Sequence, residues 1–162
     1  MSLEEYKKKR RFNKTTEPEG KVKSASSTHQ LIYVIQKHDA SHLHYDLRLE
    51  MEGVLRSWAI PKGPPAKEGE KRLAVETEDH PIGYEKFEGT IPQGEYGAGT
   101  VCIWDKGTYE LEEIKDDRII FNINGKRLCG VYCLIKLKPK EKVDKNWLFF
   151  KKKSLGKSVS GD

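Results

Sequence analysis

Strict alternation of apolar and polar side chains marks the segment from residue 42 to residue 51. The apolar positions are Leu43, Tyr45, Leu47, Leu49 and Met51, and the polar positions are His42, His44, Asp46, Arg48 and Glu50. A pleated strand projects alternate residues from opposite faces. We therefore predict a β-strand with one face in a hydrophobic core and the other face carrying chemically active groups.

Short segments of β type recur along the rest of the chain. They are rich in β-branched and aromatic residues and lie at 31–36, 54–60, 72–77, 100–104, 108–111, 118–123, 126–137 and 147–150. Turn signals separate them at Glu52-Gly53, Asp105 to Gly107, Asp116-Asp117 and Asn124-Gly125, and the last is the strongest signal for a type I′ hairpin. No segment shows convincing helical periodicity. This pattern is typical of an all-β antiparallel barrel or sandwich with long loops, and a closed barrel would remove exposed strand edges.

Composition divides the chain into three parts. Residues 1–30 are polar and basic and predict an extended N-terminal arm, residues 31–155 form the β-barrel domain, and residues 156–162 form a C-terminal tail. A chain of 162 residues is long enough for one domain with a sizeable core. The long irregular stretch EGTIPQGEYGAG is a candidate functional loop.

The charge is moderately basic and unevenly distributed. Lys and Arg number 30 against 25 Asp and Glu, with one basic run at residues 7–11 and another at residues 151–153. Such runs can follow a nucleic-acid backbone, although each is also typical of a solubilising tail.

The cysteines and the apolar runs exclude several protein classes. Cys102, Cys129 and Cys133 form no CxxC pair, which argues against a disulfide framework and a cysteine zinc site. The N-terminus lacks an apolar signal core, and no apolar run approaches the roughly 18 residues of a membrane span. We expect a cytoplasmic protein with no membrane partner.

The polar face of the predicted strand combines groups suited to one reaction type. Imidazole nitrogens and carboxylate oxygens bind transition metals, and a guanidinium is a natural fork for phosphate oxygens. The pattern therefore indicates a metal-assisted phosphoryl site, against the plainer alternative of a solvated sheet face.

Two long motifs carry a family resemblance. QKHDASHLHYDLRLEMEGVLRSWAIPKGP and RLAVETEDHPIGYEKFEGTIPQGEYGAGTVCIWDKGTYE, spanning about Gln36 to Glu110, closely resemble the phosphoesterase module of ligase D from prokaryotic non-homologous end joining. The resemblance implies a small β-barrel and a manganese-dependent enzyme acting on DNA 3′ ends. Its two steps would be a phosphodiesterase step that removes a terminal ribonucleoside and a phosphomonoesterase step that removes the remaining 3′-phosphate.

The resemblance also implies partners and site residues. We expect a free-standing module that works with a separate DNA ligase, a polymerase and a Ku-type end-binding protein. The implied Mn²⁺ ligands, with other divalent transition metals possible, are His38, His44 and Asp46. The implied catalytic residues are Arg48, His80 and Tyr84, and the implied substrate-binding residues are Gln36, Lys62, Arg72 and Glu17.

The chain departs from the family pattern at two positions. His42 stands where many relatives are expected to have Arg or another residue, and Arg11 stands where an acidic residue is expected. Strand geometry alone favours His42, His44 and Asp46 as ligands, because alternate residues share a face. The resemblance selects His38 instead, which predicts a bend at residues 39–41.

Three functions compete at this level. The leading hypothesis is a metal-dependent 3′-end phosphoesterase. The alternative is a non-catalytic nucleic-acid end-binding module that recruits a ligase, and a third is a barrel acting on small phosphoesters. The basic runs disfavour the third hypothesis.

Overall fold

The computed structural model describes residues 3–19, 30–138 and 145–153. Its strands are β1 (Leu31–Asp39), β2 (Leu43–Met51), β3 (Val54–Ile60), β4 (Lys71–Pro81), β5 (Gly89–Ile91), β6 (Gly99–Lys115), β7 (Arg118–Gly125), β8 (Cys129–Lys136) and β9 (Asn146–Lys151). The helices are the short α1 (Glu4–Lys8) and the 3₁₀ turn η1 (Tyr84–Lys86). The predicted C-terminal tail at 156–162 lies outside the described residues. No helix within the described ranges has the length and apolar character needed to cross a membrane.

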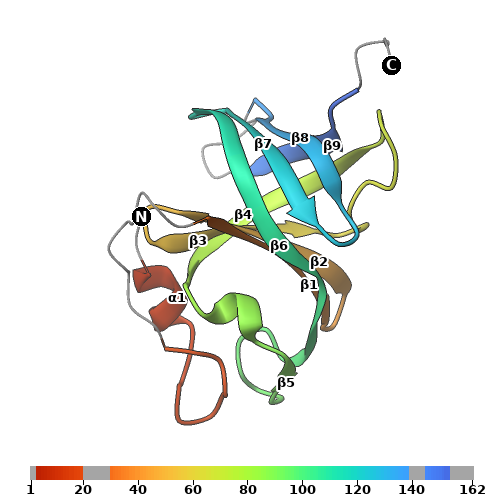
Figure 1. Cartoon of the computed structure of the whole chain (residues 1–162). Helices are drawn as coiled ribbons and strands as arrows, with labels where there is room; N and C mark the ends of the chain where they lie inside the picture. Colours follow the sequence, from red (N-terminus) through yellow and green to blue (C-terminus); the bar gives the residue numbers. More distant parts are fainter. Residues whose placement is uncertain (1–2, 20–29, 139–144, 154–162) are drawn as a thin grey trace.

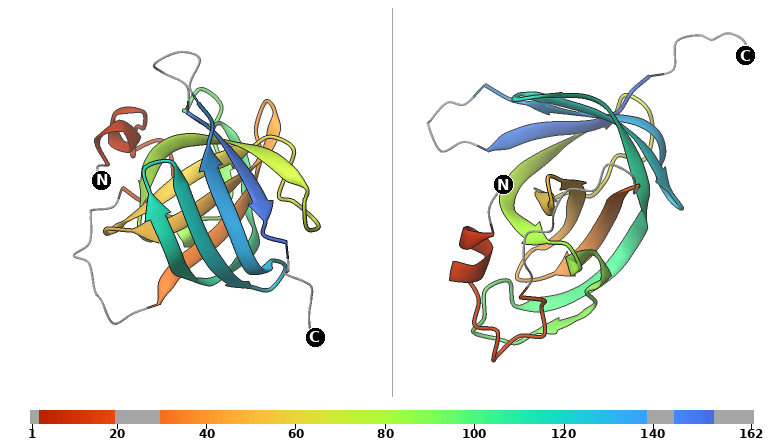
Figure 2. Two further views of the ribbon diagram at one scale, coloured as in Figure 1. Left: turned by 90° about the horizontal axis from the view of Figure 1, so that it is seen from above. Right: turned by 60° about the vertical axis from the view of Figure 1, so that its left-hand side comes forward.

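The strands form a closed antiparallel barrel, as expected. Their order is β1-β2-β3-β4-β9-β8-β7-β6, and pairing of β1 with β6 closes the ring. β5 adds to the far side of β6 at its N-terminal end. Figures 1 and 2 show the strands curling round one interior, with the N-terminal arm beside the barrel. The all-β barrel prediction is therefore confirmed.

The barrel interior holds the main hydrophobic core. Trp58 and Trp147 meet edge to face with ring centroids 5.8 Å apart, and Phe121 stacks on Phe149. These four side chains are fully buried, whereas Trp104 is only partly buried at the rim. Burial of such large side chains provides most of the driving force for folding.

A second, smaller core lies on the outer face of the barrel, over β1, β3 and β6. Its members come from the arm, η1, β5 and the strands beneath them: Tyr6, Leu55, Tyr84, Phe87, Ile91 and Val101. The sequence predicts an extended or loosely ordered arm that packing could order, and in its described residues 3–19 the helix α1 packs against β4 and fully buries Tyr6. Ordering of the arm creates a cover over one outer face of the barrel, where the polar residues of β2 lie.

Two turn predictions, at residues 105–107 and at 124–125, are wrong, and a buried carboxylate explains the second. Residues 105–107 lie inside the long strand β6, and the turn after β7 is made by residues 126–128. The buried Asp105 carboxylate accepts the backbone N–H groups of Lys126, Arg127 and Leu128 at 2.9–3.0 Å, and it accepts the Tyr33 hydroxyl at 2.9 Å. A Cβ on Gly125 would lie 2.5 Å from the Asp105 Oδ2 atom. This glycine therefore allows a close approach and does not form a type I′ turn.

Asp105→Ala is expected to lower the free energy of unfolding by about 2–4 kcal/mol. The change removes the acceptor for four hydrogen bonds, of which at least the Tyr33 hydroxyl becomes a buried unpaired donor. Urea denaturation measures the loss. The exposed turn residue Asp116 supplies the control, since Asp116→Ala should leave the midpoint within experimental error.

Candidate active site

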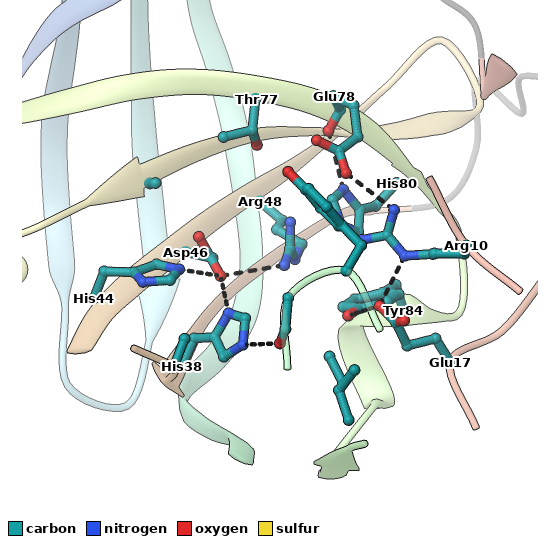
Figure 3. Close-up of a pocket in the computed structure, with 15 residues that line it drawn as sticks. Arg10, Glu17, His38, His44, Asp46, Arg48, Thr77, Glu78, His80 and Tyr84 are labelled. Carbon is teal, nitrogen blue, oxygen red and sulfur yellow. Dashed lines mark hydrogen bonds and ion pairs between the residues drawn. The ribbon is translucent and has the colours of Figure 1, made fainter. Parts of the chain in front are cut away.

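A polar pocket opens between the outer face of β1 to β4 and the segments that cover it. Its cavity volume is about 260 Å³, and its walls come from the arm, β1 to β4, η1, β5 and the loop at residues 92–98. The lining residues include Arg10, Glu17, His38, His44, Asp46, Arg48, Glu78, His80 and Tyr84. Figure 3 shows these side chains converging from both sides of the cavity. Seven of the ten predicted site residues line this pocket.

Two histidines and one aspartate form a compact cluster at one end of the pocket. His38 on β1 is the direct cross-strand partner of His44 on β2, and Asp46 lies on the same face of β2. The Asp46 Oδ2 atom is 3.6 Å from His38 Nδ1 and 3.4 Å from His44 Nε2. One candidate ligand atom from each residue lies within 4.8 Å of the other two. Within the described ranges, these three residues form the one group of this kind.

Backbone carbonyls orient both imidazole rings. His38 Nε2 lies 2.7 Å from the carbonyl oxygen of Gly97, and His44 Nδ1 lies 3.0 Å from that of His42. If each of these nitrogens donates, the other nitrogen of each ring directs its lone pair toward Asp46. Such a second hydrogen bond is typical of metal-ligating histidines. The cluster can therefore offer two imidazole nitrogens and one carboxylate oxygen to an ion.

The charged state of Asp46 is strongly favoured. Burial alone would raise the pKa of this carboxyl, but hydrogen bonds from His38 and His44 and the positive charge of Arg48 hold it well below its usual range. The hydrogen bond to Asp46 in turn raises the pKa of His44. Asp46 is therefore ionised, as a metal ligand must be.

The chain bends after His38, as predicted, and the bend is the turn of a hairpin. β1 continues to Asp39, and residues 40–42 connect it to β2 in a hairpin, so His38 belongs to a neighbouring strand. His42 is exposed and does not line the pocket. Strand alternation within one segment could not identify His38, because its proximity to His44 arises from pairing between strands.

Arg48 lies next to the cluster and is held on three sides. Its guanidinium donates to Gln36 at 2.7 Å, to Ser57 at 2.9 Å and to Asp46 at 3.5 Å. Gln36 is held in turn by the carbonyl oxygens of Tyr84 and Phe87. A guanidinium has five N–H donors, so two remain for a ligand once these three bonds with described residues are made. Gln36 thus supports Arg48 from behind, outside the pocket lining.

A second cluster joins the arm to the barrel. Arg10 donates to Glu17 at 2.9 Å and to Glu78 at 3.0 Å, and its third nitrogen lies 3.3 Å from His80 Nε2. Tyr84 donates to the same Glu17 carboxylate at 2.5 Å. Glu17 and Tyr84 therefore reach the pocket as predicted, but as members of a network centred on Arg10.

Sequence reasoning did not identify Arg10 or Glu78. Arg10 belongs to the basic run for which we predict either contact with a nucleic-acid backbone or a role as a solubilising tail, yet its side chain is only 5% exposed. Its neighbour Arg11, one of the two departures from the family pattern, is exposed and pairs with Glu95. Arg10 lies beyond the end of α1, and its guanidinium is 4.0 Å from the Tyr6 ring centroid, so its burial depends on packing of the arm and not on a local pattern in the sequence.

Lys62 and Arg72 do not line the pocket. Lys62 is exposed in the turn after β3, and Arg72 on β4 pairs with Glu70 at 3.3 Å. Both lie at the end of the barrel where β3 ends and β4 begins. Their expected role at the pocket stays a prediction that the geometry does not favour.

His80 should make the protein less stable in mild acid. Burial, followed by the charges of Arg48 and Arg10, lowers the pKa of His80 well below its ordinary value of 6.5. Below pH 6.5 the unfolded chain binds a proton that the folded protein excludes, so the free energy of unfolding falls by up to about 1.4 kcal/mol per pH unit. Denaturation in EDTA at pH 5 and pH 8 should show a smaller pH effect in His80→Asn than in the parent. Equal pH effects in the two proteins would contradict a neutral His80.

Comparison with known proteins identifies the family of this chain. A family model described as the DNA ligase D 3′-phosphoesterase domain matches residues 36–136. The multifunctional non-homologous end joining protein LigD of Pseudomonas aeruginosa is 46% identical over 156 residues, which cover 93% of this chain and 18% of that protein. LigD of Mycobacterium tuberculosis (strain H37Rv) is 47% identical over 138 residues, covering 83% of this chain and 18% of its own length. LigD of Mycolicibacterium smegmatis is 46% identical over 157 residues, which cover 90% of this chain and 20% of that protein.

This chain therefore spans about one fifth of the length of these curated relatives. The family match covers more than half of the chain and includes β2, β3 and most of the pocket residues. The chain belongs to the DNA ligase D 3′-phosphoesterase domain family.

Proposed function

We propose that this chain is a metal-dependent phosphoesterase that heals DNA 3′ ends. It would remove a terminal ribonucleoside by phosphodiester hydrolysis and then remove the remaining 3′-phosphate. The observation that carries the proposal is the His38, His44 and Asp46 cluster directly beside Arg48 in one pocket. A purely structural metal site would not need a guanidinium with N–H donors left for a ligand.

The three clustered residues fit a divalent transition metal such as Mn²⁺. Two imidazole nitrogens and one carboxylate make a mixed nitrogen and oxygen donor set, and the incomplete set leaves positions for water and phosphate oxygen. A bound ion would act as a Lewis acid on the phosphoryl oxygen and lower the pKa of an attacking water.

The surrounding residues bind and orient the phosphate in this proposal. Arg48 would use its two remaining N–H groups on the non-bridging oxygens, where negative charge accumulates. Arg10, whose charge is offset by Glu17 and Glu78, would hold these groups in position at the far side of the pocket. The lowered pKa of His80 favours a hydrogen-bonding role over donation of a proton to the leaving group. Its contact with Arg10 would hold that guanidinium in place.

The test is a 5′-labelled primer-template carrying one 3′-terminal ribonucleotide, incubated with Mn²⁺ or with EDTA and resolved on a denaturing gel. Two successive mobility changes that need Mn²⁺ and end in an extendable 3′-hydroxyl are the expected result. A strand that binds tightly but stays unaltered would favour the alternative, an end-binding module that recruits a ligase.

The partners follow from the same proposal. A 3′-hydroxyl is the end that a DNA ligase or polymerase uses, so we place this chain upstream of ligase and polymerase activities at DNA ends. A Ku-type end-binding protein would be a further partner.

A further inference from the structure

One end of the barrel is strongly basic. Four segments meet there, namely the end of the β1–β2 hairpin, the β3–β4 loop, the β7–β8 turn and the chain leaving β9 (Figure 1). Residues 37–45, 60–72, 125–130 and 150–153 together contain ten Lys or Arg and three Asp or Glu. We call this surface the basic end. Ten basic and three acidic residues give the basic end a formal charge of +7, which exceeds the net charge of +5 of the whole chain.

Several of these cations are exposed and held above aromatic rings. The Arg127 guanidinium lies 4.8 Å from the Trp104 ring centroid, and the Lys71 ammonium lies 5.7 Å from that of Phe150. Lys62, Lys67 and Lys126 are exposed, and their ammonium groups have no ion-pair partner among the described residues. The barrel therefore presents cations from separate loops on a rigid frame.

The basic end adjoins the pocket through one hairpin. His38 and His44 face the pocket from the outer side of β1 and β2, whereas Tyr45 faces the barrel mouth, where it meets Trp104 and contacts Gly63. The hairpin is thus the wall between the two surfaces. A polynucleotide whose 3′ end occupied the pocket would need a surface for its remaining nucleotides, because a cavity of about 260 Å³ is too small to hold them.

We propose that the basic end docks the double-stranded DNA next to the 3′ end that enters the pocket. This inference rests on the proposed function and assigns Lys62 to duplex binding. In the eight-stranded ring, the β3–β4 loop and the β7–β8 turn are separated by β9 on one side and by β6, β1 and β2 on the other, so the cations are distributed around the barrel mouth. That spread suits the two backbones of a duplex better than one strand. Lysine and arginine contacts to phosphates would supply the affinity.

The test compares two variants that each lose three positive charges. One is Lys62→Gln/Lys67→Gln/Lys126→Gln at the basic end, and its control is Lys115→Gln/Lys136→Gln/Lys138→Gln at the opposite end, where all three lysines are also exposed. Fluorescence anisotropy in EDTA measures binding to a 5′-labelled duplex across a salt series. Because EDTA prevents metal-dependent cleavage, the result is read independently of whether the chain is an enzyme.

The basic-end variant should bind the duplex about tenfold or more weakly at low salt, and its slope of log K against log salt should fall by about two to three. The control variant should keep most of the affinity and slope. Melting temperatures equal to that of the parent would show that both variants fold.

Three outcomes would overturn the proposal. Equal losses in both variants would indicate an effect of net charge alone. An equal fall in slope on single-stranded DNA of the same length would argue against a duplex. Full duplex affinity in the basic-end variant, with the loss appearing instead in Lys7→Gln/Lys8→Gln/Lys14→Gln, would place the contact surface on the arm.

Discussion

His44→Ala is expected to abolish both hydrolytic steps, with a fall in rate of about 10³-fold or more on a 3′-ribonucleotide primer-template. The change removes the imidazole that lies 3.4 Å from the Asp46 carboxylate and leaves two of the three proposed ligands. Metal affinity should fall in parallel, which titration with Mn²⁺ monitored by calorimetry measures. Both readouts are expected to change because the ligand set and the reaction share this ring.

His42→Ala is the matched control for His44→Ala. His42 lies two residues away in the same hairpin, is exposed, and contributes only its backbone carbonyl to the orientation of His44. Alanine keeps that carbonyl, so rate and metal affinity should change by less than about threefold, as for surface substitutions in general. A severe loss in His42→Ala would overturn the proposed ligand set in favour of His42, His44 and Asp46.

Arg48→Lys is expected to lower kcat on a 3′-phosphate primer by about 10²-fold or more, even though the positive charge remains. An ammonium group cannot reproduce the planar fork that binds Gln36, Ser57 and Asp46 at once and still offers two N–H groups to phosphate. The partners of this buried guanidinium also lose donors, so a lower melting temperature should accompany the loss. Steady-state kinetics at saturating Mn²⁺ distinguish a loss of catalysis from a loss of metal binding.

Arg56→Lys supplies the control for that substitution. Arg56 on the adjacent strand β3 bonds Glu76 at 2.9 Å and lies over the Trp58 and Trp147 rings in the barrel interior, away from the pocket. It should lower the melting temperature while leaving kcat close to that of the parent. Comparable kcat losses in the two variants would show that Arg48 acts only through stability.

Local sequence patterns were sufficient to predict most of the barrel. Period-two alternation identified β2 and its partner β3, since each strand buries one face in the barrel core. The turn signals at Glu52-Gly53 and Asp116-Asp117 were confirmed, and Glu52 and Gly53 both have positive φ. Asn124-Gly125 misled because a residue 20 positions earlier, Asp105, binds the following turn through its carboxylate. Such a distant anchor leaves no trace in local spacing.

Local sequence patterns also could not predict the packing of the N-terminal arm over the pocket. α1 has five residues, too short for a periodic signal, and it is ordered by burial of Tyr6 against the barrel. His80 occupies a strand position between Asp79 and Pro81, where the sequence reads as a turn, and its burial gives it the lowered pKa.

The sequence by itself determined the antiparallel β-fold, the polar face of β2 and, through its motifs, the set of residues that could bind a metal and a phosphate. The tertiary structure alone decided how they meet. Hairpin pairing places His38 opposite His44, and packing of the arm brings Arg10 to His80. Lys62 and Arg72, for which the resemblance implied a role at the pocket, lie instead at the end of the barrel. The physical reason is that alternation and residue type are local properties, whereas strand register, closure of the barrel and docking of the arm depend on contacts between residues far apart in the chain.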